Sequence, residues 1–290
     1  MLSYRHAFHA GNHADVLKHV VLIQSLRYLN QKDAPYMYID THAGAGLYAL
    51  DTPYATKNKE YETGISCLWG RRDLPAPLKE YVELVKELNT NSKTLRYYPG
   101  SPYLAHKIIR QDDRLRLFEL HTTESKILQT NFDKLETDAV RQSQRGRRVM
   151  IQHTDGLDAL KGLLPPPSRR GLVLIDPSYE DKNEYRLVKN TLADALKRFA
   201  TGTFAVWYPM LQQIESRQFP EKLKQLAQQR WLNVSLSINT PSTDGFGMHG
   251  SGMFLLNPPW TLEATLRDVM PYLVDVLGQN KQASFVLEGK

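Results

Sequence analysis

The sequence predicts a doubly wound α/β fold, in which seven mainly parallel strands are covered by helices. Short apolar runs alternate along the chain with amphipathic stretches of helical period, and no repeat or low-complexity tract stands out. Such an alternation is typical of strands joined by helical connections. The expected strands are residues 36–40, 115–120, 149–153, 171–176, 204–208, 234–239 and 253–257.

Residues 50–97 interrupt this alternation. Here Leu78, Tyr81, Val82, Val85 and Leu88 recur at helical spacing. Asp73, two residues before Pro75, is the expected helix start, since proline fits the first turn. A shorter helix is expected before it, around residues 61–69. We therefore expect one domain over residues 1–290 with a small helical subdomain inserted at 50–97. This insertion either packs on the core or grips the substrate.

Composition limits the class of protein. Of 290 residues, 41% are hydrophobic, which is enough for a packed core and excludes disorder as the main state. No apolar run approaches the roughly 20 residues that span a bilayer, and the first residues do not resemble a signal peptide. The single cysteine, Cys67, excludes a disulfide framework, so a cytoplasmic protein is expected. The net charge of +6 indicates an anionic partner without naming it.

A glycine-containing loop follows the first expected strand. Residues 36–46 run from an apolar strand into Gly44-Ala-Gly46, where the backbone can approach a ligand closely. Tyr48 and Ala49 follow where a dinucleotide fingerprint needs a third glycine, and no Walker lysine is present. The loop therefore indicates a nucleoside-type ligand without a pyrophosphate, of which S-adenosylmethionine is the commonest.

Two acidic residues at the next strand ends support this ligand. Glu119 ends the second expected strand, where a carboxylate can accept both ribose hydroxyls. Asp155 ends the third, where a carboxylate can accept from the amino group of adenine. Because both follow the glycine loop in order at successive strand ends, together they predict a cofactor site.

The segment Asp176-Pro177-Ser178-Tyr179 follows the fourth expected strand. The lone pair of the adenine N6 amine is delocalised into the ring, so the amine is a poor nucleophile. A carboxylate and a backbone carbonyl that accept its two N–H bonds would let the nitrogen attack a methyl group, while an aromatic ring stacks on the flipped base. The segment resembles the [Asp/Asn]-Pro-Pro-[Tyr/Phe] motif of amino-methyltransferases, with Ser178 in place of the second proline. Asp176, Pro177 and Tyr179 are the expected catalytic residues.

Asn257-Pro258-Pro259-Trp260 matches that motif better as a string. It follows the seventh expected strand, however, whereas an amine-binding motif belongs after the fourth. We therefore interpret it as a turn that ends a strand.

Four of the nine histidines, His6, His9, His13 and His19, lie in the first 19 residues. The spacing of His9 and His13 would suit zinc on a helix, but Gly11 and Asn12 between them are poor helix formers. We expect no metal, and instead expect histidines that pack over a cofactor.

Taken together, these motifs resemble those of the bacterial 23S ribosomal RNA adenine-N6 methyltransferase family. The resemblance extends over essentially the whole chain and implies a Rossmann-like S-adenosylmethionine-dependent methyltransferase sheet with a helical insertion. It also implies 23S ribosomal RNA as substrate, no membrane, no stable protein partner and a monomer. Its motifs are residues 1–6, 8–19, 40–46, 97–102, 168–179 and 198–209.

The resemblance also implies roles for particular residues. Asp176 would serve as catalytic acceptor, Tyr4 would contact the substrate with Tyr179, and the cofactor contacts would be His19, His42, Ser101, Glu119, Asp155, Gly156 and Asp176.

Two other functions remain open from the sequence. One is adenine-N6 methylation of DNA, because residue chemistry does not separate the two nucleic acids. The other is a non-catalytic nucleic-acid-binding protein involved in catabolism of external DNA, which would need no cofactor. For the RNA methyltransferase, basic clusters at residues 71–72, 145–148 and 169–170 could hold phosphates, although such runs are usually solvated faces.

Overall fold

The computed structural model describes residues 5–92, 94–136, 148–227 and 229–290 and contains a doubly wound sheet. The strand order is β10-β8-β9-β7-β6-β1-β4-β5. The strands β7, β6, β1, β4 and β5 run parallel to one another, whereas β9, β8 and β10 pair antiparallel and complete the sheet on one side. The strands are β1 (Met37–Asp40), β4 (Arg114–Phe118), β5 (Val149–Gln152), β6 (Gly171–Ile175), β7 (Thr203–Met210), β8 (Trp231–Ser237), β9 (Gly250–Leu256) and β10 (Ser284–Gly289).

The predicted fold class is confirmed, with one strand more than expected in this sheet. Each of the seven expected strands is present, with ends shifted by up to three residues. The additional strand, β10, pairs with β8 at the sheet edge, and most of its residues are exposed or half-buried. An exposed edge strand lacks the continuous apolar run by which buried parallel strands are recognised, which explains why it was missed.

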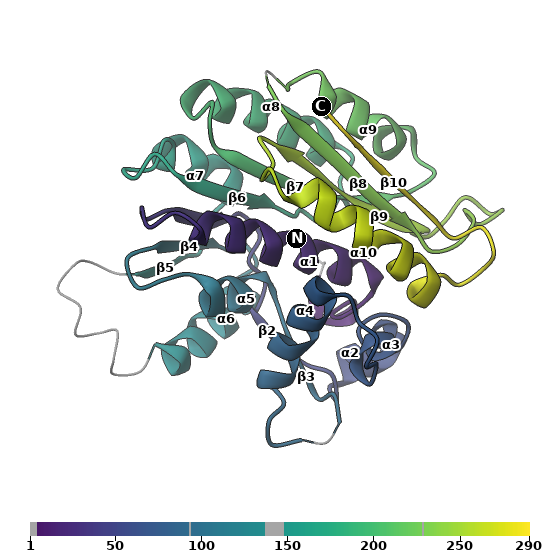
Figure 1. Ribbon diagram of the computed structural model, residues 1–290. Coiled ribbons are helices and arrows are strands. Elements are labelled where there is room, and N and C mark those ends of the chain that lie inside the picture. Colours follow the sequence, from purple (N-terminus) through teal and green to yellow (C-terminus); the bar gives the residue numbers. More distant parts are fainter. Residues whose placement is uncertain (1–4, 93, 137–147, 228) are drawn as a thin grey trace.

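Helices cover both faces of the sheet and enclose two separate cores. On one face lie α1 (His13–Asn30), α5 (Ser101–Ile108), α6 (Thr122–Leu135) and α10 (Leu262–Leu277), and on the other lie α7 (Gly156–Leu163), α8 (Asn183–Arg198) and α9 (Ile214–Lys224) (Figure 1). Within the described ranges, no helix is both long enough and apolar enough to cross a membrane.

The segment between residues 50 and 97 is largely helical. It is bracketed by β2 (Leu47–Ala49) and β3 (Tyr97–Pro99), which form a small antiparallel sheet of their own. Between them lie α2 (Pro53–Asn58), η2 (Glu60–Thr63), α3 (Ser66–Trp69) and α4 (Ala76–Glu87). The predicted stripe is the buried face of α4, with Leu88 half-buried just beyond its end. The helix starts at Ala76, because Asp73 instead accepts hydrogen bonds from Arg71 and Tyr272.

Helix α1 is central to the position of the site. Asn12 caps it by accepting from the backbone N–H groups of Ala14 and Asp15, both at 3.0 Å. The helix is buried along most of its length against β9, α5 and α4. It therefore brings the charged side chains of its first two turns, Asp15 and Lys18, toward the carboxyl ends of the parallel strands.

Candidate active site

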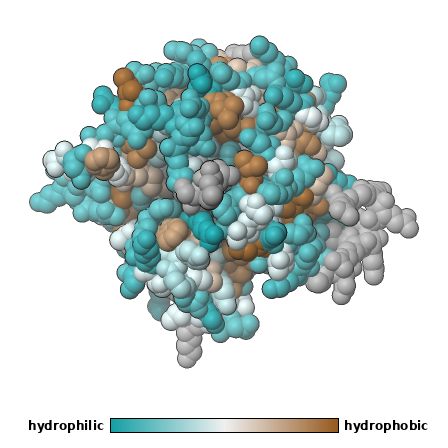
Figure 2. Space-filling view, turned by 180° about the vertical axis from the view of Figure 1, so that it is seen from behind, coloured by the Kyte–Doolittle hydropathy of each residue, from teal (hydrophilic) through white to brown (hydrophobic). Residues whose placement is uncertain are grey.

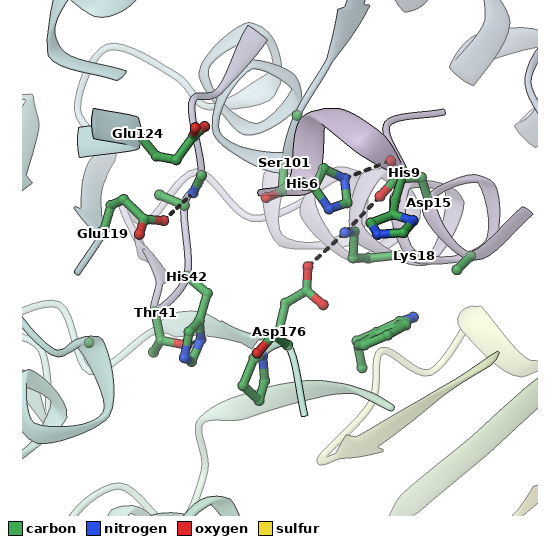
Figure 3. A pocket seen from close by; sticks show the side chains of 18 of the residues that line it. His6, His9, Asp15, Lys18, Thr41, His42, Ser101, Glu119, Glu124 and Asp176 are labelled. Atoms are coloured by element: carbon green, nitrogen blue, oxygen red, sulfur yellow. Dashed lines mark hydrogen bonds and ion pairs between the residues drawn. The ribbon is translucent and has the colours of Figure 1, made fainter. Parts of the chain in front are cut away.

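A cavity of about 330 Å³ lies at the carboxyl ends of β1, β4, β5, β6 and β7. The first turns of α1 and the short 3-10 helix η1 (His6–Phe8) approach it from the other side (Figure 3). The expected cofactor residues all line this cavity, although they come from six different segments. They are His19, His42, Ser101, Glu119, Asp155, Gly156 and Asp176.

Asp176 extends from the end of β6 and forms an ion pair with Lys18 of α1. The distance from Lys18 Nζ to Asp176 Oδ2 is 2.6 Å, and the distance from Nζ to Asp15 Oδ1 is 2.8 Å. Burial raises the pKa of Asp176 above its ordinary value, and the Lys18 ammonium opposes this rise. The pKa of Lys18 is raised, because the two carboxylates outweigh the effect of its burial. Asp176 Oδ1 receives no hydrogen bond from any described residue and can accept one from a ligand.

Asp15 anchors this arrangement from inside α1. Its Oδ2 atom accepts from the backbone N–H of Gly11 at 2.8 Å and lies 2.9 Å from His6 Nε2 (Figure 3). Burial alone would raise the pKa of Asp15, but the charges of His6 and Lys18 outweigh it and hold the pKa well below 3.8. Asp15 therefore remains a carboxylate and fixes the position of the Lys18 ammonium.

Two hydrogen-bonded groups form the side of the cavity next to β1. Asp40 Oδ2 accepts from the hydroxyls of Tyr38 and Ser101, each at 2.7 Å. Burial raises the pKa of Asp40 to about 6 even though both hydrogen bonds lower it. His19 Nδ1 lies 2.8 Å from the Tyr98 hydroxyl, and burial lowers the pKa of His19 to about 3, so its ring is neutral near pH 7. Its buried Nε2 atom has no hydrogen-bond partner among the described residues.

Glu119 has the geometry expected of a ribose acceptor. Its Oε2 atom accepts from the N–H of Gly44 and its Oε1 from the N–H of His121, each at 2.7 Å. Each oxygen therefore keeps a lone pair for a hydroxyl donor from a ligand. Gly44 adopts a φ of +58°, which favours glycine and lets the loop turn its N–H toward the carboxylate.

Asp155 and Gly156 position α7 against the glycine loop. Asp155 is the N-cap of α7, and its Oδ1 accepts from Leu157 and Asp158, so one carboxylate oxygen serves the helix. A Cβ on Gly156 would lie 2.2 Å from the carbonyl oxygen of Thr41, so no other residue fits there without moving the backbone. His42 Nδ1 lies 2.8 Å from the Thr41 hydroxyl, and burial lowers the pKa of His42 to about 4.

The structure differs from the expectation for Tyr179. This residue has a φ of +54°, which turns its ring away from the cavity and into the core under α8 and α9. The ring stacks on Tyr185 with centroids 4.4 Å apart, and its hydroxyl donates to the Trp207 carbonyl at 2.9 Å. Pro177, Ser178 and Trp207 line the cavity, whereas Tyr179 does not. A base that enters the cavity therefore does not meet the Tyr179 ring in this arrangement.

The other predictions near the site have different outcomes. Tyr4 lies outside the described residues. Asn257 follows β9 at the ends of the strands opposite the cavity, because β9 runs antiparallel to β7. Its side-chain amide donates to the carbonyls of Ala200 and Gly202. It ends a strand, as interpreted.

The N-terminal histidines do not share one helix. His9 precedes the Asn12 cap and lies 2.8 Å from Glu60, whereas His13 is the first residue of α1. Over the ranges that the structure describes, no three His, Cys, Asp or Glu side chains gather as metal ligands would.

Sequence reasoning missed Lys18, Asp15 and the buried carboxylate of Asp40. A signal was present for the first two. Residues 14–26 are apolar except for Asp15, Lys18, His19, Gln24 and Ser25, and charges in a helix that is buried on most sides need partners from elsewhere. Which partner Lys18 finds depends on β6, 158 residues away.

The donor set fits the parts of a nucleoside sulfonium. Glu119 suits a ribose diol, Asp155 lies beside the glycine loop for an adenine amine, and the acidic lining suits a positively charged ligand. A glycine loop after β1, acids after β4 and β5, and Asp-Pro after β6 on a doubly wound sheet together define an S-adenosylmethionine-dependent methyltransferase. The chain belongs to the family described as ribosomal RNA large subunit methyltransferase D, RlmJ, whose model matches residues 33–288.

Similar proteins match over nearly the whole chain. The ribosomal RNA large subunit methyltransferase J of Haemophilus influenzae is 42% identical over 288 residues, which is 99% of this chain and 98% of that protein. The protein of the same name from Escherichia coli K12 is 44% identical over 273 residues, which is 94% of this chain and 93% of that protein. The crystal structure of a Legionella pneumophila protein is 37% identical, with a TM-score of 0.85 over 97% of this chain and 98% of that one.

Proposed function

We propose that this protein transfers a methyl group from S-adenosylmethionine to the N6 amine of an adenine in 23S ribosomal RNA. The observation that carries the proposal is the Asp176 carboxylate, which is 14% exposed at the cavity and has one oxygen fixed by Lys18 and the other available. The names of the two similar bacterial proteins support ribosomal RNA as substrate.

Asp176 prepares the amine for attack. Its Oδ1 atom accepts one N–H of the adenine amine and the carbonyl of Pro177 accepts the other, which localises the nitrogen lone pair. When bound, S-adenosylmethionine would supply a sulfonium methyl group; its transfer to the nitrogen would break the S–CH3 bond, leave the sulfur as a neutral thioether and require the amine to lose one proton. The Lys18 ammonium opposes the rise that burial causes in the pKa of Asp176, and so favours the carboxylate form that acts as acceptor.

The remaining cavity residues position the two ligands. Glu119 accepts the ribose hydroxyls of the cofactor and Asp155 accepts from its adenine amine. The further cofactor contacts that we propose are His19, His42, Ser101 and Gly156, and Tyr4 contacts the substrate. The flipped base lies against Pro177, Trp207 and Leu211, which line the cavity near Asp176, while Tyr179 holds the turn after β6 from inside the core.

The test is transfer of tritium from labelled S-adenosylmethionine to protein-free 23S RNA from a strain that lacks the gene, followed by nucleoside analysis. Wild type is expected to place label in N6-methyladenosine, with adenine-containing DNA as the parallel substrate. Asp176→Ala is expected to lose at least about 100-fold in kcat, whereas Asp194→Ala, at a half-buried acid of α8 that pairs with Arg198 outside the cavity lining, retains the wild-type rate. Label in another nucleoside, preference for DNA, or full activity of Asp176→Ala would contradict the proposal.

A further inference from the structure

An exposed phenylalanine lies on a turn close to the active-site cavity. Phe246 is 79% exposed, more than any other large hydrophobic side chain in the described part of the chain. It belongs to the connection between β8 and β9. Met248, two residues further, lines the cavity, so at most about 7 Å of backbone separates Phe246 from a lining residue.

The turn holds Phe246 in a defined place. Gly245 and Gly247 adopt φ values of +82° and +88° on either side of the ring. The Phe246 N–H donates to Asp244 Oδ1 at 2.9 Å, and the Gly245 N–H donates to the Ser242 carbonyl at 3.1 Å.

A second set of contacts ties this turn to the end of β7. The Gln212 side-chain amide donates to the Ser242 carbonyl, and the His249 N–H donates to the Met210 carbonyl at 3.2 Å. Leu211, which lies between Met210 at the end of β7 and Gln212, lines the cavity. An anchored turn therefore presents the exposed ring two residues before Met248, which lines the cavity.

The surroundings of Phe246 suit a flat apolar partner of similar size. The residues before it in the turn are polar, Ser242, Thr243 and Asp244, so the ring is not part of a continuous apolar patch such as a protein partner would cover. Hydrophobic side chains on the face in Figure 2 likewise occur in small separate groups among hydrophilic ones. A nucleobase fits an isolated ring, because each base offers a π-face for stacking.

We propose that Phe246 stacks on the RNA bases beside the target adenine and fills the space that the adenine leaves when it rotates into the cavity. Apolar side chains inserted between bases stabilise unstacked nucleic acid in this way, and the flipped state is otherwise costly. The inference rests on the proposed function, and it assigns to this turn the part of substrate binding that depends on RNA structure.

The test compares two short RNAs around the mapped target, one with the adenine paired inside a stem and one without the complementary strand. Phe246→Ala is expected to lower kcat/KM about tenfold on the stem and no more than about twofold on the single strand, with the KM for S-adenosylmethionine unchanged. Phe246→Trp retains the stacking surface and most of the activity. The control is Trp260→Ala, since Trp260 is 71% exposed but packs on Arg230 beyond the opposite end of β9.

The outcomes separate this inference from the proposed function. A wild-type protein that methylates neither RNA refutes the proposed function itself. If the wild type is active, the stacking role is refuted when Phe246→Ala has the same kcat/KM values as Trp260→Ala, or when its kcat/KM falls equally on both RNAs. The stacking role is also refuted if Phe246→Ala loses activity on ribosomal particles but not on protein-free RNA, a result that assigns Phe246 to a protein contact.

Discussion

Lys18 shows how single residues define the chemistry of this site. Its ammonium lies between Asp15 of its own helix and Asp176, which follows β6, and all three side chains are largely buried. A buried ion pair contributes little net stability, because desolvation offsets most of the attraction. What the pair does contribute is a fixed position and charge for Asp176, which makes Lys18 a positioning residue.

Replacing Lys18 by Met should shift the pH dependence of methyl transfer. Burial already raises the pKa of Asp176 and Lys18 opposes the rise, so without the ammonium the pKa rises further. The carboxylate is the form that accepts the hydrogen bond of the amine N–H, so the acid limb of the kcat profile is expected to move to higher pH. Lys18→Arg keeps the charge and should keep the limb near its wild-type position. If Lys18→Met lowers kcat at every pH without moving the acid limb of the pH profile, the positioning role of Lys18 is contradicted.

At the scale of elements, amphipathic or fully apolar segments were predictable and exposed ones were not. The expected strands and the α4 stripe carry strong periodic patterns, whereas β10 and the short pair β2–β3 do not. Glu119 and Asp155 could be placed because parallel strands end at one edge, so order along the chain fixes their neighbourhood. The direction of the Tyr179 side chain could not be predicted from the sequence, because it depends on one φ value and on packing against α8 and α9.

The contact between α7 and the glycine loop gives a prediction with a matched control. Gly156→Ala places a Cβ 2.2 Å from the Thr41 carbonyl, so α7 must move and both stability and S-adenosylmethionine affinity should fall. Gly162→Ala, in the same helix with nothing within 4 Å of its Cβ, should stabilise by about 0.5–1 kcal/mol. Urea unfolding and calorimetric titration of both variants measure this. If both substitutions change the free energy of unfolding and the S-adenosylmethionine affinity equally, helix propensity alone explains their effects.

On the scale of the whole molecule, the net charge of +6 is spread over groups that the fold partly uses for itself. Arg71 pairs with Asp73, Arg148 with Glu136, and Arg170 donates to the Leu29 and Ala34 carbonyls. Arg145 and Arg147 lie outside the described residues. The clusters suggested by the sequence are thus partly structural, and RNA phosphates depend on the remaining basic side chains.

Binding of RNA should therefore depend on salt to a moderate degree. With about four phosphates neutralised on single-stranded RNA, a fourfold rise in salt should weaken binding about 50-fold. Affinity for S-adenosylmethionine, which involves no phosphate, should change little over the same range. Filter binding of RNA and calorimetry of the cofactor at matched salt concentrations test this. RNA affinity that is independent of salt would exclude phosphate contacts as the main attraction.

The sequence by itself determined the doubly wound architecture, the glycine loop and the order of acids at successive strand ends. These features follow from local periodicity and from the rule that parallel strands share one carboxyl edge. Only the tertiary structure decided that Lys18 holds Asp176, that Tyr179 turns into the core and that Phe246 stays exposed on a turn next to the cavity-lining Met248. Each of these depends on the packing of segments far apart in the chain, where small differences in backbone direction choose which side chains meet.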